Sequence, residues 1–209
     1  MGQAMRMMSY SQSKDIVNTV NIPSLVINNA PLSFYKLDDG VMGGQSQTHI
    51  DKLLQKSEGS GVVFTGTINT EGGGFTSIRS KLNNGIPSTA KGLKLKYKGD
   101  GKTYKLLLSD GKGGGPFSSS PSWQCDLPTK PGDKVEECDV LFVDFIPSFG
   151  GRSSLNEEER KQYNFVNEEI KQIGLMLSLK LSNGESNPLS TFGSGIFDFK
   201  LEVDEIELI

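Results

Sequence analysis

Residues 37–48, LDDGVMGGQSQT, place two adjacent carboxylates beside three glycines. Paired carboxylates carry out acid–base chemistry in glycosidases, and glycine-rich loops bind phosphate groups through their backbone N–H groups. Neighbouring side chains of an extended chain point to opposite faces, so Asp38 and Asp39 are not expected to share a proton. The segment also lacks the GxxxxGK[ST] order of a phosphate-binding loop and leads into no recognisable helix. We therefore predict neither chemistry here.

The other chemically capable residues are few. His49 is the only histidine and lies in the polar alternation SQTHIDKL, which predicts a structural or surface role. Cys125 and Cys138 are 13 residues apart, outside the close pairing of zinc motifs. Two free thiols are expected, with one disulfide as the alternative. Catalytic residues, a cofactor and a metal are not predicted, although loop oxygens leave a structural cation as a minority alternative.

Composition excludes several functional classes. The net charge of −3, with both signs mixed along the chain, gives no strong positive field for nucleic acid. No apolar run approaches the ~18 residues that a membrane-spanning helix needs. Glycine contributes 25 of 209 residues, well above average usage, which suits a fold rich in turns and strands.

Alternation of apolar and polar residues with a period of two predicts the elements. Residues 61–69 and 74–82 read as strands joined by a hairpin-like connection, and residues 92–99 and 102–110 as a hairpin around GDG. Residues 154–169 favour one short helix, with Ser154 and Glu157 at the spacing of a capping box. We predict an all-β antiparallel β-sandwich with one short helix: residues 1–20 form a flexible lead-in, and residues 21–209 a single domain. Further strands are predicted within residues 123–128, 138–147, 170–181 and 195–209.

Five segments in this order resemble one family: FYKLDDGVMGGQSQ, VVFTGTINTEGGGFTSIRSKL, GLKLKYKGDGKTYKLLLSD, WQCDLP and GIFDFKLEVDEIEL. Between them they extend over residues 34–208, and they resemble the complex I intermediate-associated protein 30 family. The family usually has a tryptophan shortly before its NDGVMGG; here Phe34 or Tyr35 is the aromatic residue, and Asp38 replaces asparagine.

The resemblance implies a galactose-binding-like jelly roll and a non-catalytic assembly factor. Such a protein would bind protein subunits of a respiratory or photosynthetic complex during its assembly. It also implies a mitochondrial location, with cytoplasm or chloroplast as alternatives, although no targeting peptide is visible in this chain. A carbohydrate-binding-module-like protein that binds a glycan on a concave sheet face is the alternative function.

Within the motif, the glycines are expected to shape the backbone. Gly40, Gly43 and Gly44 permit a tight loop, beneath which Met42 would fill an irregular gap. Gly74 would serve the facing connection in the same way.

Two side-chain roles follow from this arrangement. Phe75 is expected to anchor its strand in the core. Asp39 is predicted to accept a bidentate hydrogen bond from Arg79, which would tie the loop to the sheet. In the functional alternative, Asp39, Arg79 and Ser46 line a shallow site for a sugar or peptide.

Trp123, the only tryptophan, raises a similar choice. Core packing is favoured, because Tyr97, its candidate neighbour on a platform, shares a strand face with Leu93 and Leu95. The alternative is a sugar-stacking platform in which Trp123 joins Tyr97 or Tyr104.

Overall fold

Two antiparallel sheets dominate the computed structural model, which describes residues 20–27, 29–49, 61–112, 120–149 and 155–209. The seven-stranded sheet has the order β1-β2-β5-β11-β7-β8-β10, and the five-stranded sheet the order β3-β4-β12-β6-β9. The strands are β1 Val20–Ile27, β2 Ala30–Lys36, β3 Gln47–Thr48, β4 Val62–Asn69, β5 Phe75–Lys81, β6 Gly92–Lys98, β7 Thr103–Ser109, β8 Ser122–Pro128, β9 Glu136–Leu141, β10 Ile146–Ser148, β11 Gln172–Ser178 and β12 Ile196–Leu208.

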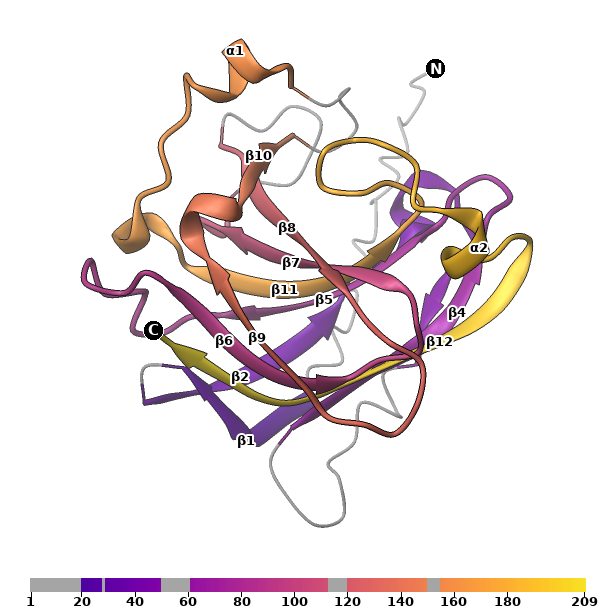
Figure 1. The fold of residues 1–209 in the computed structure, drawn as a ribbon, viewed down its shortest axis with the longest axis horizontal. Helices are drawn as coiled ribbons and strands as arrows, with labels where there is room; N and C mark the ends of the chain where they lie inside the picture. The colour runs from indigo at the N-terminus through magenta and orange to yellow at the C-terminus, as the bar shows by residue number, and fades with distance from the viewer. Residues whose placement is uncertain (1–19, 28, 50–60, 113–119, 150–154) are drawn as a thin grey trace, which may run out of the picture.

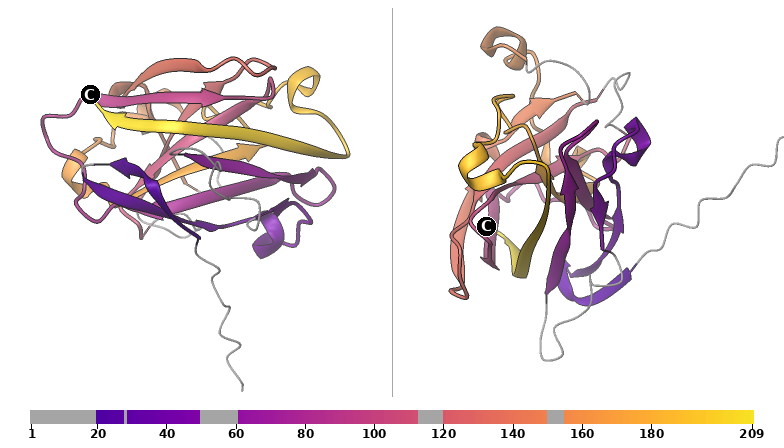
Figure 2. Two further views of the ribbon diagram at one scale, coloured as in Figure 1. Left: turned by 90° about the horizontal axis from the view of Figure 1, so that it is seen from below. Right: turned by 90° about the vertical axis from the view of Figure 1, so that its right-hand side faces the viewer.

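Short helices occupy the connections. They are η1 Asp39–Met42, η3 Phe142–Asp144, α1 Glu157–Arg160, η4 Asn167–Glu169 and α2 Leu189–Phe192. The long strand β12 runs the length of the sandwich and ends at the C-terminus beside β6 (Figure 1; Figure 2, left). None of the helices among the described residues is long and apolar enough to cross a membrane.

The space between the sheets is filled by the apolar residues that period-two alternation turns inward. Phe64, Tyr104 and Phe199, which come from both sheets, form an aromatic group with ring centroids 4.8–6.3 Å apart. Edge-to-face and tilted arrangements of this kind are the geometry that aromatic quadrupoles favour. The predicted all-β sandwich is therefore confirmed.

Both predicted hairpins are wrong. β4 and β5 do not pair with each other: β4 pairs with β3 and β12, whereas β5 pairs with β2 and β11 in the other sheet. β6 and β7 are likewise divided between the sheets. Alternation identifies a strand with one buried face, but two strands packed face to face across a core show the same pattern as two paired strands.

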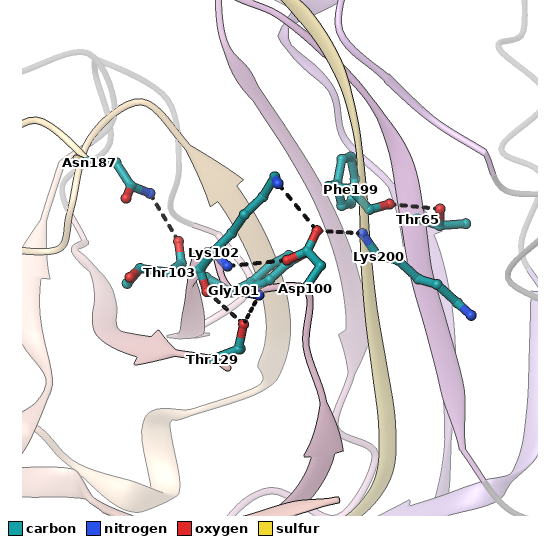
Figure 3. A network of polar contacts seen from close by, with 10 residues as sticks. Thr65, Asp100, Gly101, Lys102, Thr103, Thr129, Asn187, Phe199 and Lys200 are labelled. Atoms are coloured by element: carbon teal, nitrogen blue, oxygen red, sulfur yellow. Dashed lines mark hydrogen bonds and ion pairs between the residues drawn. The ribbon is translucent and has the colours of Figure 1, made fainter. Parts of the chain in front are cut away.

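The β6–β7 connection crosses between the sheets and is held by Asp100 (Figure 3). Its carboxylate accepts hydrogen bonds from the Tyr104 hydroxyl, 3.0 Å, and from the backbone N–H of Lys200 on β12, 3.0 Å. The same carboxylate lies 3.5 Å from the Lys102 ammonium. One side chain thus joins a residue of the seven-stranded sheet to a strand of the five-stranded sheet.

Three further differences concern local structure. The predicted helix over residues 154–169 is reduced to the single turn α1 and the separate turn η4, and Asn156 with Glu159 forms the capping box. Ser154 lies outside the described residues, as does all of the predicted lead-in except its last residue, Val20, which already belongs to β1. The β1–β2 hairpin was not anticipated; it turns at Asn29, whose φ of 60° is in the left-handed region.

Candidate functional site

Asp39, at the start of η1, is completely buried and lies at the centre of the glycine-rich motif. Its Oδ1 accepts the Ser46 N–H at 2.9 Å, and its Oδ2 accepts the N–H groups of Gly74 at 2.7 Å and Phe75 at 3.3 Å. Hydrogen bonds to a charged acceptor are stronger than those between neutral groups. The carboxylate therefore joins its own loop to the start of β5.

The glycines around Asp39 are required by close approach. A Cβ at Gly44 would lie 2.3 Å from the Asp39 Cγ, and one at Gly73 would lie 2.3 Å from its Oδ2. Gly43 ends η1 with a φ of 88°, which favours glycine. Gly40 has open space where its Cβ would be. The predicted shaping role is accurate for Gly43 and Gly44, whereas no steric need appears at Gly40.

Polar side chains brace the same loop further along the chain. Ser46 Oγ donates to the Asn69 carbonyl at 3.2 Å and accepts the Asn69 N–H at 3.0 Å. Asp38 accepts both the N–H and the hydroxyl of Thr48, at 2.9 and 2.5 Å. Asp38 and Asp39 thus bind different groups, and each of the two carboxylates has a structural role.

The predicted Asp39–Arg79 pair is wrong. Both Asp39 oxygens accept backbone N–H groups, one in its own loop and the others at the start of β5. Arg79 lies four residues after Phe75, so about 13 Å separates their Cα atoms in an extended strand. The Arg79 Nη1 instead lies 3.5 Å from Oε1 of Gln172 on β11. A shallow site lined by Asp39, Ser46 and Arg79 is not formed, because all three side chains are buried and Asp39 is completely so.

Two apolar expectations at the motif also need correction. Met42 does not fill a gap beneath the loop but is 68% exposed. Phe75 is half-buried and lies on the same strand face as Ser77 and Arg79, the face turned away from the core residue Ile78. The strand begins at Phe75, so the core-facing alternation starts one residue later than expected.

Trp123 is a core residue, 8% exposed, with its ring 5.3 Å from that of Phe165 in an edge-to-face arrangement. Tyr97 and Tyr104 are buried as well. A sugar-stacking platform made of Trp123 with either tyrosine is therefore excluded, because stacking requires an exposed ring face.

The remaining side chains capable of chemistry are His49 and the two cysteines. His49 Nε2 lies 3.4 Å from the Thr67 hydroxyl. Cys125 and Cys138 are both free, on β8 and β9 of different sheets. Burial raises the pKa of the Cys125 thiol to about 12 and also raises that of Cys138. Among the described residues, no three His, Cys, Asp or Glu side chains gather as metal ligands.

A group of polar residues that sequence reasoning missed lies on the outer face of the seven-stranded sheet. We call it the outer polar cluster; it comprises Tyr35, Arg79, Lys105, Ser109, Gln124 and Gln172. Gln172 Nε2 donates to the Tyr35 hydroxyl at 2.7 Å, and its Oε1 accepts from Ser109 Oγ at 3.2 Å and from Arg79. Lys105 Nζ donates to Gln124 Oε1 at 3.1 Å. These residues come from five separate strands, so the sequence does not show that they lie together. The only sequence signal is the alternation of β5 and β7, which puts Arg79 and Lys105 on the outward faces of their strands.

The family model for complex I intermediate-associated protein 30 matches residues 27–203. The chain belongs to this family. Membership in the complex I intermediate-associated protein 30 family supports a role associated with complex I assembly. No curated protein sequence matches the chain.

Solved structures agree on the fold. A family 11 carbohydrate-binding module from Clostridium thermocellum, in complex with a β-1,3-1,4-mixed-linked tetrasaccharide, is 16% identical with a TM-score of 0.51. The alignment covers 91% of this chain and 94% of the module. A second structure of this module, from a cellulosomal cellulase of the same organism, gives 16% identity and a TM-score of 0.51 over 92% and 94% of the two chains. This member of the complex I intermediate-associated protein 30 family therefore has a jelly-roll fold similar to that of carbohydrate-binding modules.

Proposed function

We propose that the protein is a non-catalytic assembly factor that binds protein subunits while a respiratory or photosynthetic complex is assembled. The family match over residues 27–203 is the observation that carries this proposal. The buried bonds of Asp39 add support, because they use the one acidic pair that suggested chemistry to hold backbone in place. Mitochondria are the location that family membership favours.

The contact surface that we propose for these subunits lies at the end of the sandwich where the glycine-rich motif is found. Met42, Leu189 and Ile196 are large, apolar and exposed there. Thr70 and Gly195 exchange hydrogen bonds beside Ile196, which pairs with Asn69. In Figure 2 (left), η1 and α2 both lie toward the end opposite the C-terminus. Exposed apolar side chains on well-braced elements are typical of protein contact sites.

Proximity labelling in the native cell tests the proposal, with mitochondrial and chloroplast fractions analysed separately. We expect the labelled proteins to be enriched in subunits of one respiratory or photosynthetic complex. Met42→Glu should reduce this enrichment without changing the thermal unfolding midpoint. Val143→Glu, at an exposed apolar residue on η3, serves as the control and should label normally. Labelling that enriches no complex subunits would contradict the proposal.

The carbohydrate alternative has weaker support. It rests on the fold shared with the two modules at 16% identity. The aromatic residues predicted to stack on sugar, Trp123, Tyr97 and Tyr104, are buried. We therefore do not propose a second function.

A further inference from the structure

The strands at the ends of the two sheets are β1, β10, β3 and β9, and their open edges differ in protection (Figure 1). β3 has two residues, β10 has three, and the register of β1 shifts between Asn21 and Val26. β9 has six residues in unbroken register with β6, and it contains no proline or lysine. Short strands, bulges, prolines and lysines are the usual protection of an edge, because unpaired backbone groups bind other strands. The edge of β9 lacks all of these.

Alternate backbone groups of β9 point to this open edge. The Phe142 N–H, just past the end of β9, donates to the Lys91 carbonyl just before β6, at 2.9 Å. Because hydrogen-bonded and non-bonded pairs alternate in an antiparallel ladder, every second residue back from Phe142 also bonds to β6. The backbone groups that point away from β6 are therefore those of Glu137, Asp139 and Leu141. Among the described residues, no further hydrogen bond reaches these groups.

Charge alternates from strand to strand on the solvent face of this sheet. Two rows cross β12, β6 and β9 in that order: Glu205, Lys96 and Glu137, and then Glu207, Lys94 and Asp139. The face is thus acidic on β12, basic on β6 and acidic on β9. Opposite charges on directly opposed residues of adjacent strands stabilise their pairing. A strand beside β9 would continue this order with basic side chains.

The carboxylates of β9 are only partly neutralised. Lys96 Nζ lies 2.6 Å from Oε2 of Glu205 on the other side of β6. Lys94 Nζ lies 3.6 Å from Glu137 and 4.0 Å from Asp139, so one ammonium is shared by two carboxylates. The side chains of Glu137 and Asp139 are 51% and 55% exposed. Their negative charge disfavours pairing with β9 of a second copy and favours a positively charged strand.

Apolar surface accompanies the charge along β9. Cys138 and Val140 face the core, and Cys138 is only half-buried at the open margin of the sandwich. Leu141 and Val135, at and just before the ends of the strand, are 41% and 52% exposed. Side chains of an added strand alternate between the two faces of the sheet. Those that lie between the basic residues would therefore cover Cys138 and extend the core.

We propose that the open edge of β9 binds an extended basic segment of a partner protein, which adds to the five-stranded sheet as a further strand. The backbone groups of Glu137, Asp139 and Leu141 supply the hydrogen bonds, as in other cases of strand addition. Lysine or arginine at every second position of the segment faces the two carboxylates, and apolar residues alternate with them. The edge is separate from the contact surface around Met42, and the proposal does not rest on that surface.

β6 shows which sequence pattern β9 accepts, because residues 92–99, GLKLKYKG, already pair with its other side. A capped, fluorescently labelled peptide of this sequence is therefore the probe, and anisotropy measures its binding. We expect saturable binding that weakens as salt is raised. The same peptide with its three lysines replaced by glutamate should not bind.

Charge reversal on β9 tests the role of the carboxylates. The double variant Glu137→Lys and Asp139→Lys should weaken peptide binding about 10-fold or more. Glu158→Lys is the control, since it reverses an exposed charge on α1, and it should leave binding unchanged.

Leu141→Pro tests the backbone groups without changing the charge. Leu141 has a φ of −80°, within the range that proline adopts, and its N–H points away from β6. The thermal unfolding midpoint should therefore stay close to that of the wild type. Peptide binding should weaken about 5-fold or more, because one edge donor is lost.

Amide hydrogen exchange, followed by NMR, shows whether the peptide pairs with the edge. In the free protein the amides of Glu137, Asp139 and Leu141 should exchange faster than those of Cys138 and Val140, which bond to β6. Bound peptide should slow the exchange of the first three. The proposal would be overturned if the basic peptide did not bind, if its binding survived charge reversal, or if it bound without protecting these amides.

Discussion

Gly44 and Gly40 are both close to Asp39 in the sequence, but only Gly44 packs against its carboxylate. The two glycines therefore form a matched pair for testing that contact by substitution with alanine. In Gly44→Ala the new Cβ would lie 2.3 Å from the Asp39 carboxylate carbon, so the loop or the carboxylate must move. We expect the free energy of unfolding to fall by about 2–3 kcal/mol, the usual effect of overpacking and broken buried hydrogen bonds. Urea denaturation monitored by circular dichroism measures it.

Gly40→Ala is the control for that substitution. A Cβ at Gly40 meets nothing within 4 Å, and its φ is not in the left-handed region. Its free energy of unfolding should stay within about 0.5 kcal/mol of the wild type. Equal losses in the two variants would show that the Asp39 carboxylate does not set the glycine requirement.

The lowered pKa of Lys105 predicts the direction in which the free energy of unfolding changes with pH. Its pKa in the folded protein is lowered to about 8 from 10.5, so between these values the unfolded chain binds more protons than the folded one. Stability contributed by this group therefore rises as pH rises from about 8 to about 10.5, and below pH 8 the charged amine is destabilising. Across this pH range the contribution of Lys105 to the free energy of unfolding changes by roughly 3 kcal/mol.

Comparison with Lys105→Met isolates this effect from the other groups that titrate at high pH. The wild type should gain stability relative to the variant between pH 7.5 and 10, as measured by urea denaturation at each pH. Raised pKa values of Cys125 and Cys138 act in the opposite direction above pH 9 but are common to both proteins. A difference in stability that does not change with pH would contradict the lowered pKa.

At the scale of elements, the hydrogen bonds of Asp100 connect the two sheets, and their contribution to stability can be measured. Asp100→Ala removes the acceptor of the Tyr104 hydroxyl and of the Lys200 N–H and leaves the buried hydroxyl unpaired. We expect a loss of about 2–3 kcal/mol in the free energy of unfolding. Asp133→Ala, an exposed aspartate in the turn before β9, should change it by less than about 0.5 kcal/mol.

A double-mutant cycle with Tyr104→Phe separates the two bonds. Tyr104→Phe removes the hydroxyl but keeps the ring among its aromatic neighbours. The double variant should lose less than the sum of the single losses, because both remove the same Tyr104–Asp100 bond. Strict additivity would mean that this bond contributes nothing to joining the sheets.

The elements were largely predictable, whereas their pairing was not. Leu93, Leu95 and Tyr97 alternate with lysines, which identifies β6 and its buried face from sequence alone. That pattern contains no information on whether β7 lies beside β6 or across the core from it. The β1–β2 hairpin turns at Asn29, a residue type that favours the left-handed conformation, so its turn signal is present in the sequence although this hairpin is not among the predicted elements.

For the whole molecule, the motif was recognised correctly but its internal contacts were not. The close packing of Gly44 beside Asp39 and the left-handed Gly43 agree with the residue types and their spacing, whereas Gly40 does not. The partner of Asp39 was not predicted correctly, since it is backbone at the start of β5 rather than the Arg79 side chain. The outer polar cluster could not be predicted without the register, because β5, β11 and β7 become neighbours only in the folded sheet.

The two thiols report on whether the sandwich unfolds as one unit. Cys125 packs against the core from the seven-stranded sheet and Cys138 from the five-stranded sheet. With the pKa of Cys125 raised to about 12 from 9, its thiolate fraction at pH 8 is about 1000-fold below that of the unfolded chain. Reaction with an aromatic disulfide reagent should therefore proceed mainly through opening of the structure.

Because the sheets share one core and are joined at Asp100, we expect both thiols to become reactive with the same dependence on urea. The single-cysteine variants Cys125→Ala and Cys138→Ala allow each rate to be measured separately, and circular dichroism gives the global transition for comparison. Matching free energies of opening would indicate cooperative unfolding of both sheets. Reaction of Cys138 at clearly lower urea than Cys125 would mean instead that the five-stranded sheet opens independently, and that the Asp100 connection does not couple the two layers.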